Sequence, residues 1–291
     1  MVVAESPFGL SGQSRASALR RHGEDQAKKE NKAQSHNQLP IGIYVHGGGY
    51  ALRDLDSEDA VCRAIAEHAD TVIVSVDYRL APEHKAPVQL DDVLKGIEWA
   101  HMNAHLFNGD PQKLFVMGIS TGAGLALSAA RKLAVGHPSV PNETIKGVVA
   151  VVPVTLHPQN VPERFKAEYT AYEQNGDDSP MINRTSMEQF FDLAEIDSHN
   201  LEYFSAADLD GHRLFPPTYI GTCEFDPLRD DERLMAKSLL DAGVAVRSDH
   251  YDGLPHCFWI FPKLLETDVS MEKTLSGVKW VIESMTSKIG Q

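Results

Sequence analysis

Short apolar runs alternate along the chain with longer segments in which apolar residues recur at helical spacing, beginning near residue 41. The runs are rich in β-branched residues, as in 71–76 (TVIVSV), which is typical of buried strands. Strands are predicted at 41–46, 71–76, 114–117, 147–152, 217–222 and 245–251. Helices are predicted at 58–68, with Ser57 as N-cap, and at 88–103, 120–133, 228–242 and 270–288. This order predicts an α/β fold, with a mostly parallel central sheet flanked by helices.

Two segments depart from this rhythm. Residues 1–38 contain few bulky apolar side chains after position 10, so we expect a polar, mobile segment or one weak helix there. Residues 154–212 are polar with scattered aromatic and Met residues, and about sixty residues are too many for a plain connection between strands. We predict that they form an inserted helical cap over the active edge of the sheet, while 39–153 and 213–291 form the core. The alternative is a peripheral excursion with its own minor core.

Composition and charge narrow the classes of function. The 291 residues include 41 Asp and Glu against 27 Lys and Arg, which gives a formal net charge of −14. Such an acidic chain is a poor candidate for binding nucleic acid or an anionic membrane surface. No apolar run approaches the ~18 residues that a membrane-spanning helix needs. The hydrophobic content of 42% is ordinary for a globular α/β protein.

The expected compartment follows from the cysteines and the chain ends. The cysteines are sparse and odd in number: Cys62, Cys223 and Cys257. They form no disulfide framework and favour a reducing compartment, so we expect a cytoplasmic protein. The Arg and Ser residues near the N-terminus suggest a transit peptide, which Glu24 and Asp25 disfavour. The tripeptide 287–289 (SKI) is similar to a peroxisomal address, although two residues follow it, so a peroxisome is the alternative.

The segment 118–122 (GISTG) has the form G-x-S-x-G and lies between a predicted strand and a predicted helix. A nucleophilic serine is held on such a strand-to-helix turn, where flanking glycines relieve the crowding. The helix N-terminus then lies beneath developing negative charge. Ser120 is therefore the predicted nucleophile, and a glycine-lined packing turn is the alternative.

Three successive glycines, 47–49, follow the first predicted strand in the run His46–Tyr50. Their backbone N–H groups are free to approach a substrate oxygen, as a tetrahedral intermediate requires. A phosphate-binding P-loop is excluded because no Lys-Ser or Lys-Thr follows. We expect His46 to hold this loop by hydrogen bonds rather than to react.

A serine alcohol needs a base, and His256 is the best candidate among thirteen histidines. It lies in a loop (253–256, GLPH) after a predicted strand, where catalytic groups collect in parallel sheets. Asp226 follows another predicted strand and would orient the imidazole, although Asp before Pro227 is also a typical helix N-cap. The neighbouring acids raise the question of a metal, which we do not expect because no histidine lies among them. The order Ser120, Asp226, His256 is that of α/β-hydrolases.

These motifs resemble those of the hormone-sensitive lipase family of α/β-hydrolases. The shared features are 46–49 (HGGG), 76–84 (VDYRLAPEH), the Ser120 elbow, 225–230 (FDPLRD) and 253–256 (GLPH), within residues 41 to about 262. The resemblance implies an α/β-hydrolase fold and a serine esterase without metal or organic cofactor. It also implies an oxyanion hole formed by Gly48, Gly49 and the N–H of Thr121, and a structural role for 76–84 in pinning the elbow and the glycine loop. The cap and the C-terminal half are more narrowly similar to fungal esterases of secondary-metabolite, toxin-pathway clusters.

The chain departs from this family at several positions. The family usually has Asp-Ser-Ala-Gly-Gly at the elbow, where this chain has 119–123 (ISTGA). Ile119 removes a polar neighbour and Thr121 places a β-branch beside an oxyanion donor, and either change could slow or redirect catalysis. Cys257 stands where glycine is common. The segment before the glycine loop is short for the family, so an incomplete cap or sheet edge and a more open pocket are expected.

The predicted function is a serine carboxylic ester hydrolase that acts on a small to medium apolar ester through an acyl-enzyme, in fungal secondary metabolism. One alternative is a lyase or cyclase on the same scaffold, in which the oxyanion hole stabilises an enolate. The other is a non-hydrolytic binding protein, which the retention of His256 disfavours. The expected partner is a small-molecule ester, and a homodimer is the oligomer considered.

Overall fold

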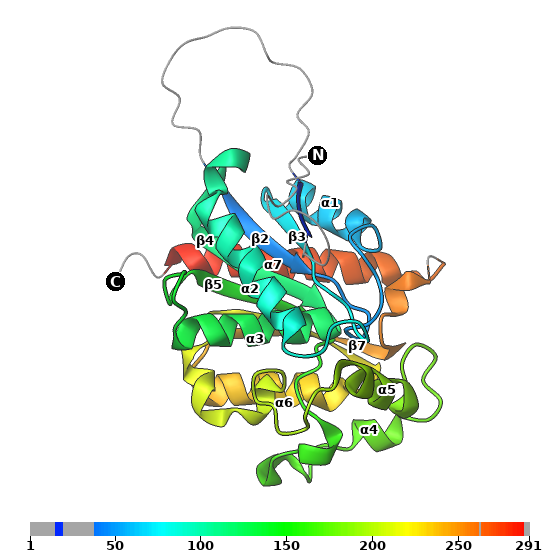
Figure 1. The fold of residues 1–291 in the computed structure, drawn as a ribbon. Helices are drawn as coiled ribbons and strands as arrows, with labels where there is room; N and C mark the ends of the chain where they lie inside the picture. The colour runs from blue at the N-terminus through cyan, green and yellow to red at the C-terminus, as the bar shows by residue number, and fades with distance from the viewer. Residues whose placement is uncertain (1–14, 20–37, 262, 288–291) are drawn as a thin grey trace, which may run out of the picture.

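The computed structural model describes residues 15–19, 38–261 and 263–287 (Figure 1). The strands in these ranges are β1 (Arg15–Leu19), β2 (Leu39–Val45), β3 (Val72–Asp77), β4 (Gly109–Ile119), β5 (Ile145–Val151), β6 (Thr218–Phe225) and β7 (Val246–Pro255). They form one sheet in the order β1-β3-β2-β4-β5-β6-β7, and every neighbouring pair apart from β1 and β3 is parallel. The predicted fold class, a mostly parallel α/β-hydrolase sheet, is confirmed.

Strand β1 was not anticipated from the sequence. It pairs antiparallel with β3, from Arg15 opposite Asp77 to Leu19 opposite Ile73. An edge strand is held by backbone hydrogen bonds to one neighbouring strand. The amino-acid composition of the segment does not reveal such bonds, so the strand could not be predicted from it. Residues 1–14 and 20–37, which hold the remainder of the candidate transit peptide, lie outside the described residues, as do Lys288 and Ile289 of the peroxisome-like tripeptide.

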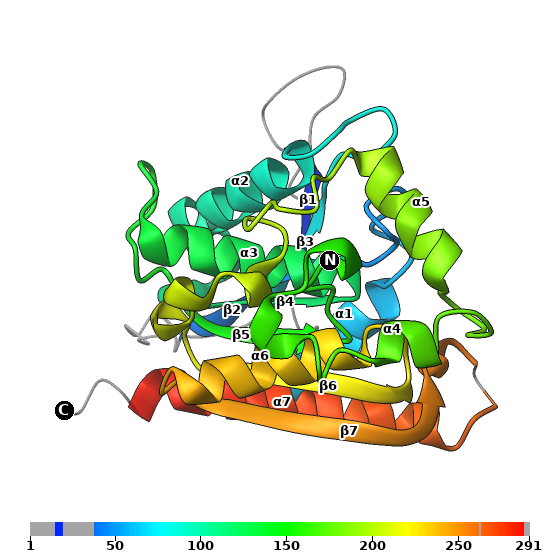
Figure 2. The same cartoon turned by 90° about the horizontal axis from the view of Figure 1, so that it is seen from below.

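Helices cover both faces of the sheet (Figures 1 and 2). The helices that pack on the sheet are α1 (Asp59–His68), α2 (Val88–Met102), α3 (Thr121–Val135), α6 (Arg229–Asp241) and α7 (Glu266–Ser287). Apolar side chains of α2, α3 and α6 form one core cluster with the sheet, and those of α1 and α7 form a second one on the opposite face. No helix in the described ranges is long and apolar enough to cross a membrane.

The predicted cap of the first long helix is wrong. Glu58 occupies the N-cap position, and no side chain caps the helix there. The Ser57 hydroxyl instead donates to Asp54 at 2.7 Å, because Asp54 closes the preceding turn by accepting from both the amide and the hydroxyl of Ser57.

A long excursion separates β5 from β6 and lies beside the carboxyl ends of the strands (Figure 2). It contains the short helix α4 (Ala171–Gln174) and the helix α5 (Arg184–Ala194), with single turns of 3-10 helix at 158–160, 163–165 and 205–207 and a longer one at 209–214. Two further 3-10 turns lie outside it, at 104–107 and 258–260. A capping box starts α5, because Asn183 and Ser186 each bind the other's backbone N–H. We call residues 154–212, which were predicted to form a cap, the cap below.

Candidate active site

The register of the sheet brings distant segments together at its carboxyl edge. Phe225 of β6 pairs with Pro255 of β7, so the next residues, Asp226 and His256, leave neighbouring strand ends side by side. On the other side of β4, Val45 pairs with Gly118, which brings the glycine loop alongside the Ser120 turn. The positions of the predicted groups therefore follow from strand pairing.

Ser120, His256 and Asp226 form one hydrogen-bonded chain. His256 Nε2 lies 3.0 Å from Ser120 Oγ, and His256 Nδ1 lies 2.6 Å from Asp226 Oδ2. The residues are 7%, 2% and 0% exposed, respectively, so water competes little for these bonds. A hydroxyl, an imidazole and a carboxylate in this arrangement can transfer a proton away from an attacking alcohol.

Ser120 lies at a strained turn between β4 and α3. Its φ of 56° and ψ of −126° are unusual for a residue with a side chain. The turn is tight enough that a Cβ on Gly122 would lie 2.2 Å from the carbonyl oxygen of Val45, so only glycine fits there. The Ser120 amide donates to the carbonyl of Val151 at 2.9 Å and fixes the turn on the sheet. The G-x-S-x-G glycines are thus required by close packing.

The N-cap role considered for Asp226 is wrong, because Leu228 occupies the N-cap position of α6 and no side chain caps that helix. The two oxygens of Asp226 nevertheless have different partners. Oδ2 faces His256, whereas Oδ1 accepts from the amide of Leu228 at 2.8 Å. The Asp226 carbonyl also accepts from Asn175 Nδ2 of the cap at 3.1 Å. The carboxylate is therefore fixed in orientation while it faces the imidazole.

Burial and the neighbouring Asp226 carboxylate act on the pKa of His256 in opposite directions. Burial alone would lower the pKa of the imidazole, because the charged form loses water. The adjacent Asp226 carboxylate, together with the side chain of Cys257, outweighs burial, so the pKa of His256 lies above its ordinary value. The pair thus stabilises the imidazolium that forms when a serine proton is taken up.

His46 supports the glycine loop. Its Nδ1 lies 2.8 Å from the Gly47 carbonyl, and its ring stacks on Tyr78 with centroids 4.2 Å apart. The Tyr78 hydroxyl donates to the His46 carbonyl at 3.0 Å. Ala81, from the same stretch as Tyr78, donates its amide to Tyr50 at 2.9 Å. These contacts give His46 the structural role expected of it, and they tie the 76–84 stretch to the glycine loop.

Three amides were expected to form the oxyanion hole, and they differ in their surroundings. The amides of Gly48 and Thr121 have no hydrogen-bond partner within the described ranges. The Gly49 amide donates to Thr121 Oγ1 at 3.0 Å. The loop reaches this shape through left-handed φ values of 109° at Gly48 and 65° at Gly49.

Two supports of this loop were missed from the sequence. Below it, the buried Glu58 accepts from the Tyr44 hydroxyl at 2.6 Å and pairs with Arg53 at 3.2 Å. Above it, Phe190 of α5 packs so closely that a Cβ on Gly49 would lie 2.3 Å from its ring. Both depend on contacts across the fold that no local motif signals.

The acidic cluster after Asp226 joins the cap to the core. Asp230 Oδ2 accepts from the amides of Thr170 and Ala171 at 2.7 and 2.6 Å. Asp231 Oδ1 accepts from the amides of Thr155 and Leu156 at 2.9 and 2.8 Å. Burial raises the pKa of Asp231 to about 7, because these bonds offset the loss of water only in part. No group of three or more His, Cys, Asp or Glu side chains in the described residues is arranged to hold a metal ion.

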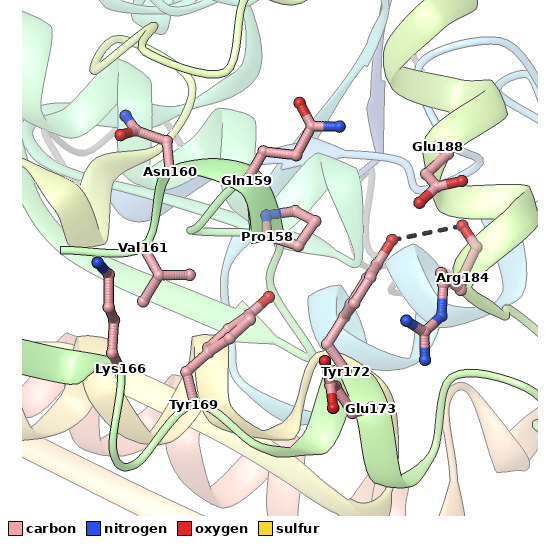
Figure 3. Close-up of a pocket in the computed structure, with 10 residues that line it drawn as sticks. All are labelled: Pro158, Gln159, Asn160, Val161, Lys166, Tyr169, Tyr172, Glu173, Arg184 and Glu188. Atoms are coloured by element: carbon pink, nitrogen blue, oxygen red, sulfur yellow. Dashed lines mark hydrogen bonds between the residues drawn. The ribbon is translucent and has the colours of Figure 1, made fainter. Parts of the chain in front are cut away.

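A pocket of about 470 Å³ lies in the cap between α4, α5 and the turn at 158–160 (Figure 3). The tyrosine rings of Tyr169 and Tyr172 form part of its wall, and the Tyr172 hydroxyl donates to the Arg184 carbonyl at 3.3 Å. The other lining residues are Pro158, Gln159, Asn160, Val161, Lys166, Glu173, Arg184 and Glu188. Several of the remaining large side chains of 154–212 are buried in the core instead: Phe165, Met187, Phe191, Tyr203 and Phe204.

The departures from the family pattern are accommodated by packing. Ile119 joins the apolar cluster of α1 and α7 and borders a small cavity of about 30 Å³. Cys257 is buried, with a left-handed φ of 52°, a conformation that glycine adopts more easily. Neither residue interrupts the hydrogen bonds of Ser120, His256 and Asp226.

Comparison with known proteins agrees with this geometry. A family model described as the alpha/beta hydrolase fold matches residues 42–260. The versiconal hemiacetal acetate esterase of Dothistroma septosporum is 44% identical over 247 residues, which cover 85% of this chain and 75% of that protein. The carboxylesterase NlhH of Mycobacterium tuberculosis is 34% identical over 229 residues, which cover 76% of this chain and 66% of that protein.

Two solved structures extend the comparison. Vibralactone cyclase superposes with a TM-score of 0.83 at 29% identity, and the match covers 94% of this chain and 77% of the cyclase chain. A hyperthermophilic esterase from Pyrobaculum calidifontis superposes with a TM-score of 0.73 at 29% identity and covers 91% and 79%. The chain belongs to the α/β hydrolase fold family. Within that family it is a serine ester hydrolase of the carboxylesterase type, whose substrates are small-molecule esters.

Proposed function

We propose that Ser120 is the nucleophile of this esterase, His256 its general base and acid, and Asp226 the group that orients the imidazole. The unbroken chain of hydrogen bonds from Ser120 Oγ through His256 to Asp226 Oδ2 carries this proposal. The positive φ of Ser120 supports it, because a strained turn of this kind presents a hydroxyl at the edge of the sheet.

The reaction proceeds in two acyl transfers. Ser120 Oγ forms a bond to the ester carbonyl carbon while His256 Nε2 takes its proton. The bond to the leaving alcohol then breaks, and His256 returns the proton to that alcohol. Water attacks the acyl-enzyme in the same way, the bond to Ser120 breaks, and the hydroxyl recovers its proton.

The developing oxyanion lies against backbone amides at the elbow and the glycine loop. We assign this role first to Gly48 and Thr121, because their amides have no other partner within the described residues. Loss of one such donor typically costs about 10²–10³ in kcat. Gly49 was predicted as a third donor, and its amide is the subject of the further inference below.

We propose a short acyl group, acetate above all, on a larger alcohol as the substrate class. The name of the 44% identical relative, an acetate esterase, supports the short acyl group. We further propose that the alcohol part contacts the cap, where Tyr169 and Tyr172 line a pocket and their flat aromatic side chains offer contact area. A role in fungal secondary metabolism goes with this assignment.

The experiment is active-site labelling joined to a substrate panel. We expect a fluorophosphonate probe to label the protein at Ser120, and Ser120→Ala to lose labelling and at least about 10⁴ in kcat on p-nitrophenyl acetate. Ser128→Ala is the matched control, because Ser128 lies on α3 with a buried hydroxyl that has no partner in the described ranges. Labelling of another residue, or turnover retained by Ser120→Ala, would refute the assignment. A kcat/KM that rises steadily from acetate to octanoate would refute the acyl preference.

A cyclase is the second candidate, because the chain superposes on vibralactone cyclase with a TM-score of 0.83. A hydroxyl within the substrate would then resolve the acyl-enzyme in place of water and release a lactone. Mass spectrometry of the products from a hydroxy-ester substrate separates the two, since the free acid retains the elements of water that the lactone lacks. Free acid alone, from an ester able to close a five- or six-membered ring, would exclude the cyclase.

We propose that the enzyme works in a reducing compartment, with the cytoplasm preferred to the peroxisome. The free, buried state of Cys62, Cys223 and Cys257 supports this. Imaging of the tagged protein in its host tests the compartment, and sedimentation of the purified protein tests the predicted homodimer.

A further inference from the structure

The Gly49 amide is already occupied in the resting enzyme. It donates to Thr121 Oγ1 at 3.0 Å, whereas the amides of Gly48 and Thr121 have no partner in the part of the chain that the structure describes. The hydroxyl that occupies it belongs to the residue directly after the proposed nucleophile. Thr121 therefore has two effects on the oxyanion site: its backbone amide is a donor there, and its hydroxyl accepts the hydrogen bond of a second donor, the Gly49 amide.

Contacts on both sides hold this pair in place. Thr121 is fully buried, so water does not compete for its hydroxyl. Tyr78 steadies the residues just before Gly49, because its hydroxyl donates to the His46 carbonyl at 3.0 Å. On the other side of Gly49, the ring of Phe190 covers its Cα.

A hydrogen bond accelerates a reaction only if it is stronger in the transition state than in the ground state. The Gly49 amide has an acceptor before the oxyanion forms. To bind the oxyanion it would have to leave Thr121 Oγ1, which would then remain buried without a donor from the loop. Its net contribution to the transition state is therefore small.

We propose that the Thr121 hydroxyl is a positioning group that withholds the Gly49 amide from the oxyanion. The enzyme then stabilises the tetrahedral intermediate with two amides, those of Gly48 and Thr121, and reacts more slowly than its backbone would allow. This inference rests on the proposed role of Ser120 and revises the oxyanion hole expected from the sequence by removing Gly49 from its working donors.

The test removes the hydroxyl and keeps the shape. Thr121→Val leaves the Gly49 amide without an acceptor until the oxyanion forms. We expect kcat on p-nitrophenyl acetate to rise about tenfold, below the 10²–10³ typical of a fully optimised donor, with KM little changed. The inhibition constant of an alkyl trifluoromethyl ketone, to whose carbonyl Ser120 adds to give a hemiketal oxyanion, should fall by a similar factor. Thr121→Ser restores the acceptor and should bring both values back toward those of the wild type.

Thr144→Val is the matched control for loss of a buried threonine hydroxyl. Thr144 donates to the Pro141 carbonyl at 2.7 Å and precedes β5, at the opposite edge of the sheet from Ser120. Removal of this hydroxyl should lower the stability of the protein without tightening the binding of the ketone. A fall in kcat together with weaker ketone binding in Thr121→Val, or no change in either, would overturn the proposal.

A measurement on the wild-type protein covers the case in which Thr121→Val does not fold. In ¹⁵N-labelled enzyme, formation of the ketone adduct should move the amide proton resonances of Gly48 and Thr121 downfield and leave that of Gly49 nearly unmoved. A downfield shift of Gly49 as large as that of Gly48 would overturn the proposal. A wild-type enzyme that forms no covalent adduct with the ketone at all would instead refute Ser120 as the nucleophile.

Discussion

Replacing Asp230 with alanine should detach one end of the cap from the core. Asp230 is almost fully buried, and its Oδ2 accepts from the amides of Thr170 and Ala171 at 2.7 and 2.6 Å, where α4 begins. Its Oδ1 pairs with Arg229 Nε at 3.0 Å. Arg229 also reaches Gln174 at 3.0 Å, so the pair holds both ends of α4.

The magnitude follows from these contacts. Each amide bond to a carboxylate contributes about 1.5–3 kcal/mol, and removal of one partner leaves the other buried and unpaired. Breaking a buried ion pair from one side costs about 3–5 kcal/mol in typical cases. We therefore expect Asp230→Ala to lower the free energy of unfolding by about 3–5 kcal/mol. Asp230→Asn, which keeps a neutral oxygen acceptor, should lose less.

Urea unfolding followed by circular dichroism measures this difference, with an unchanged m-value as the check that the unfolded state is the same. Asp241→Ala is the control, because Asp241 is an exposed acid on the same helix and its loss should stay within about 0.5 kcal/mol. A loss below about 1 kcal/mol for Asp230→Ala would show that these bonds do not hold the cap. KM for bulky esters should rise in the same variant, since α4 forms part of the pocket wall.

Two further predictions concern the reacting groups and the glycine loop. Activity requires neutral His256, so kcat/KM should rise with pH. Since Asp226 raises the pKa of His256, the midpoint of the pH–rate profile should lie above 6.5. Asp226→Asn should move that midpoint down and lower kcat by about 10⁴, and an unmoved midpoint would contradict the assignment. Gly49→Ala would place a methyl 2.3 Å from Phe190 at a φ of 65°, so it should melt earlier and lose activity. The double variant that also carries Phe190→Ala should recover only part of the lost melting temperature.

The residues of the site were predictable because each belongs to a local pattern. Ser120 lies in a glycine-flanked turn between strand and helix, and Asp226 and His256 each follow a buried strand. The parallel topology then accounts for their meeting, since the carboxyl ends of adjacent strands share one edge. Sequence distance did not matter for these three, because the sheet fixes where each strand ends.

The remaining features depend on partners that are distant in the chain. Asp230 meets Thr170 across 60 residues, and Gly49 meets Thr121 across 72, so neither contact has a local signature. The length of the last strand was also underestimated. The strand predicted at 245–251 continues to Pro255, although Gly253 and Pro255 usually interrupt strands. Backbone pairing with β6 carries it on to the residue before His256.

The fastening of the cap by Asp230 and Asp231 has a consequence for how such enzymes diversify. Both anchors lie within five residues of Asp226, on the helix that follows it, and both hold the cap through its backbone amides, with added bonds from the hydroxyls of Thr155 and Thr170. The amide bonds themselves do not depend on which side chains the cap carries, so the exposed positions of the intervening loop and of α5 are free to vary. New substrate ranges can be acquired by exchanging that stretch while the proton-relay geometry is inherited intact.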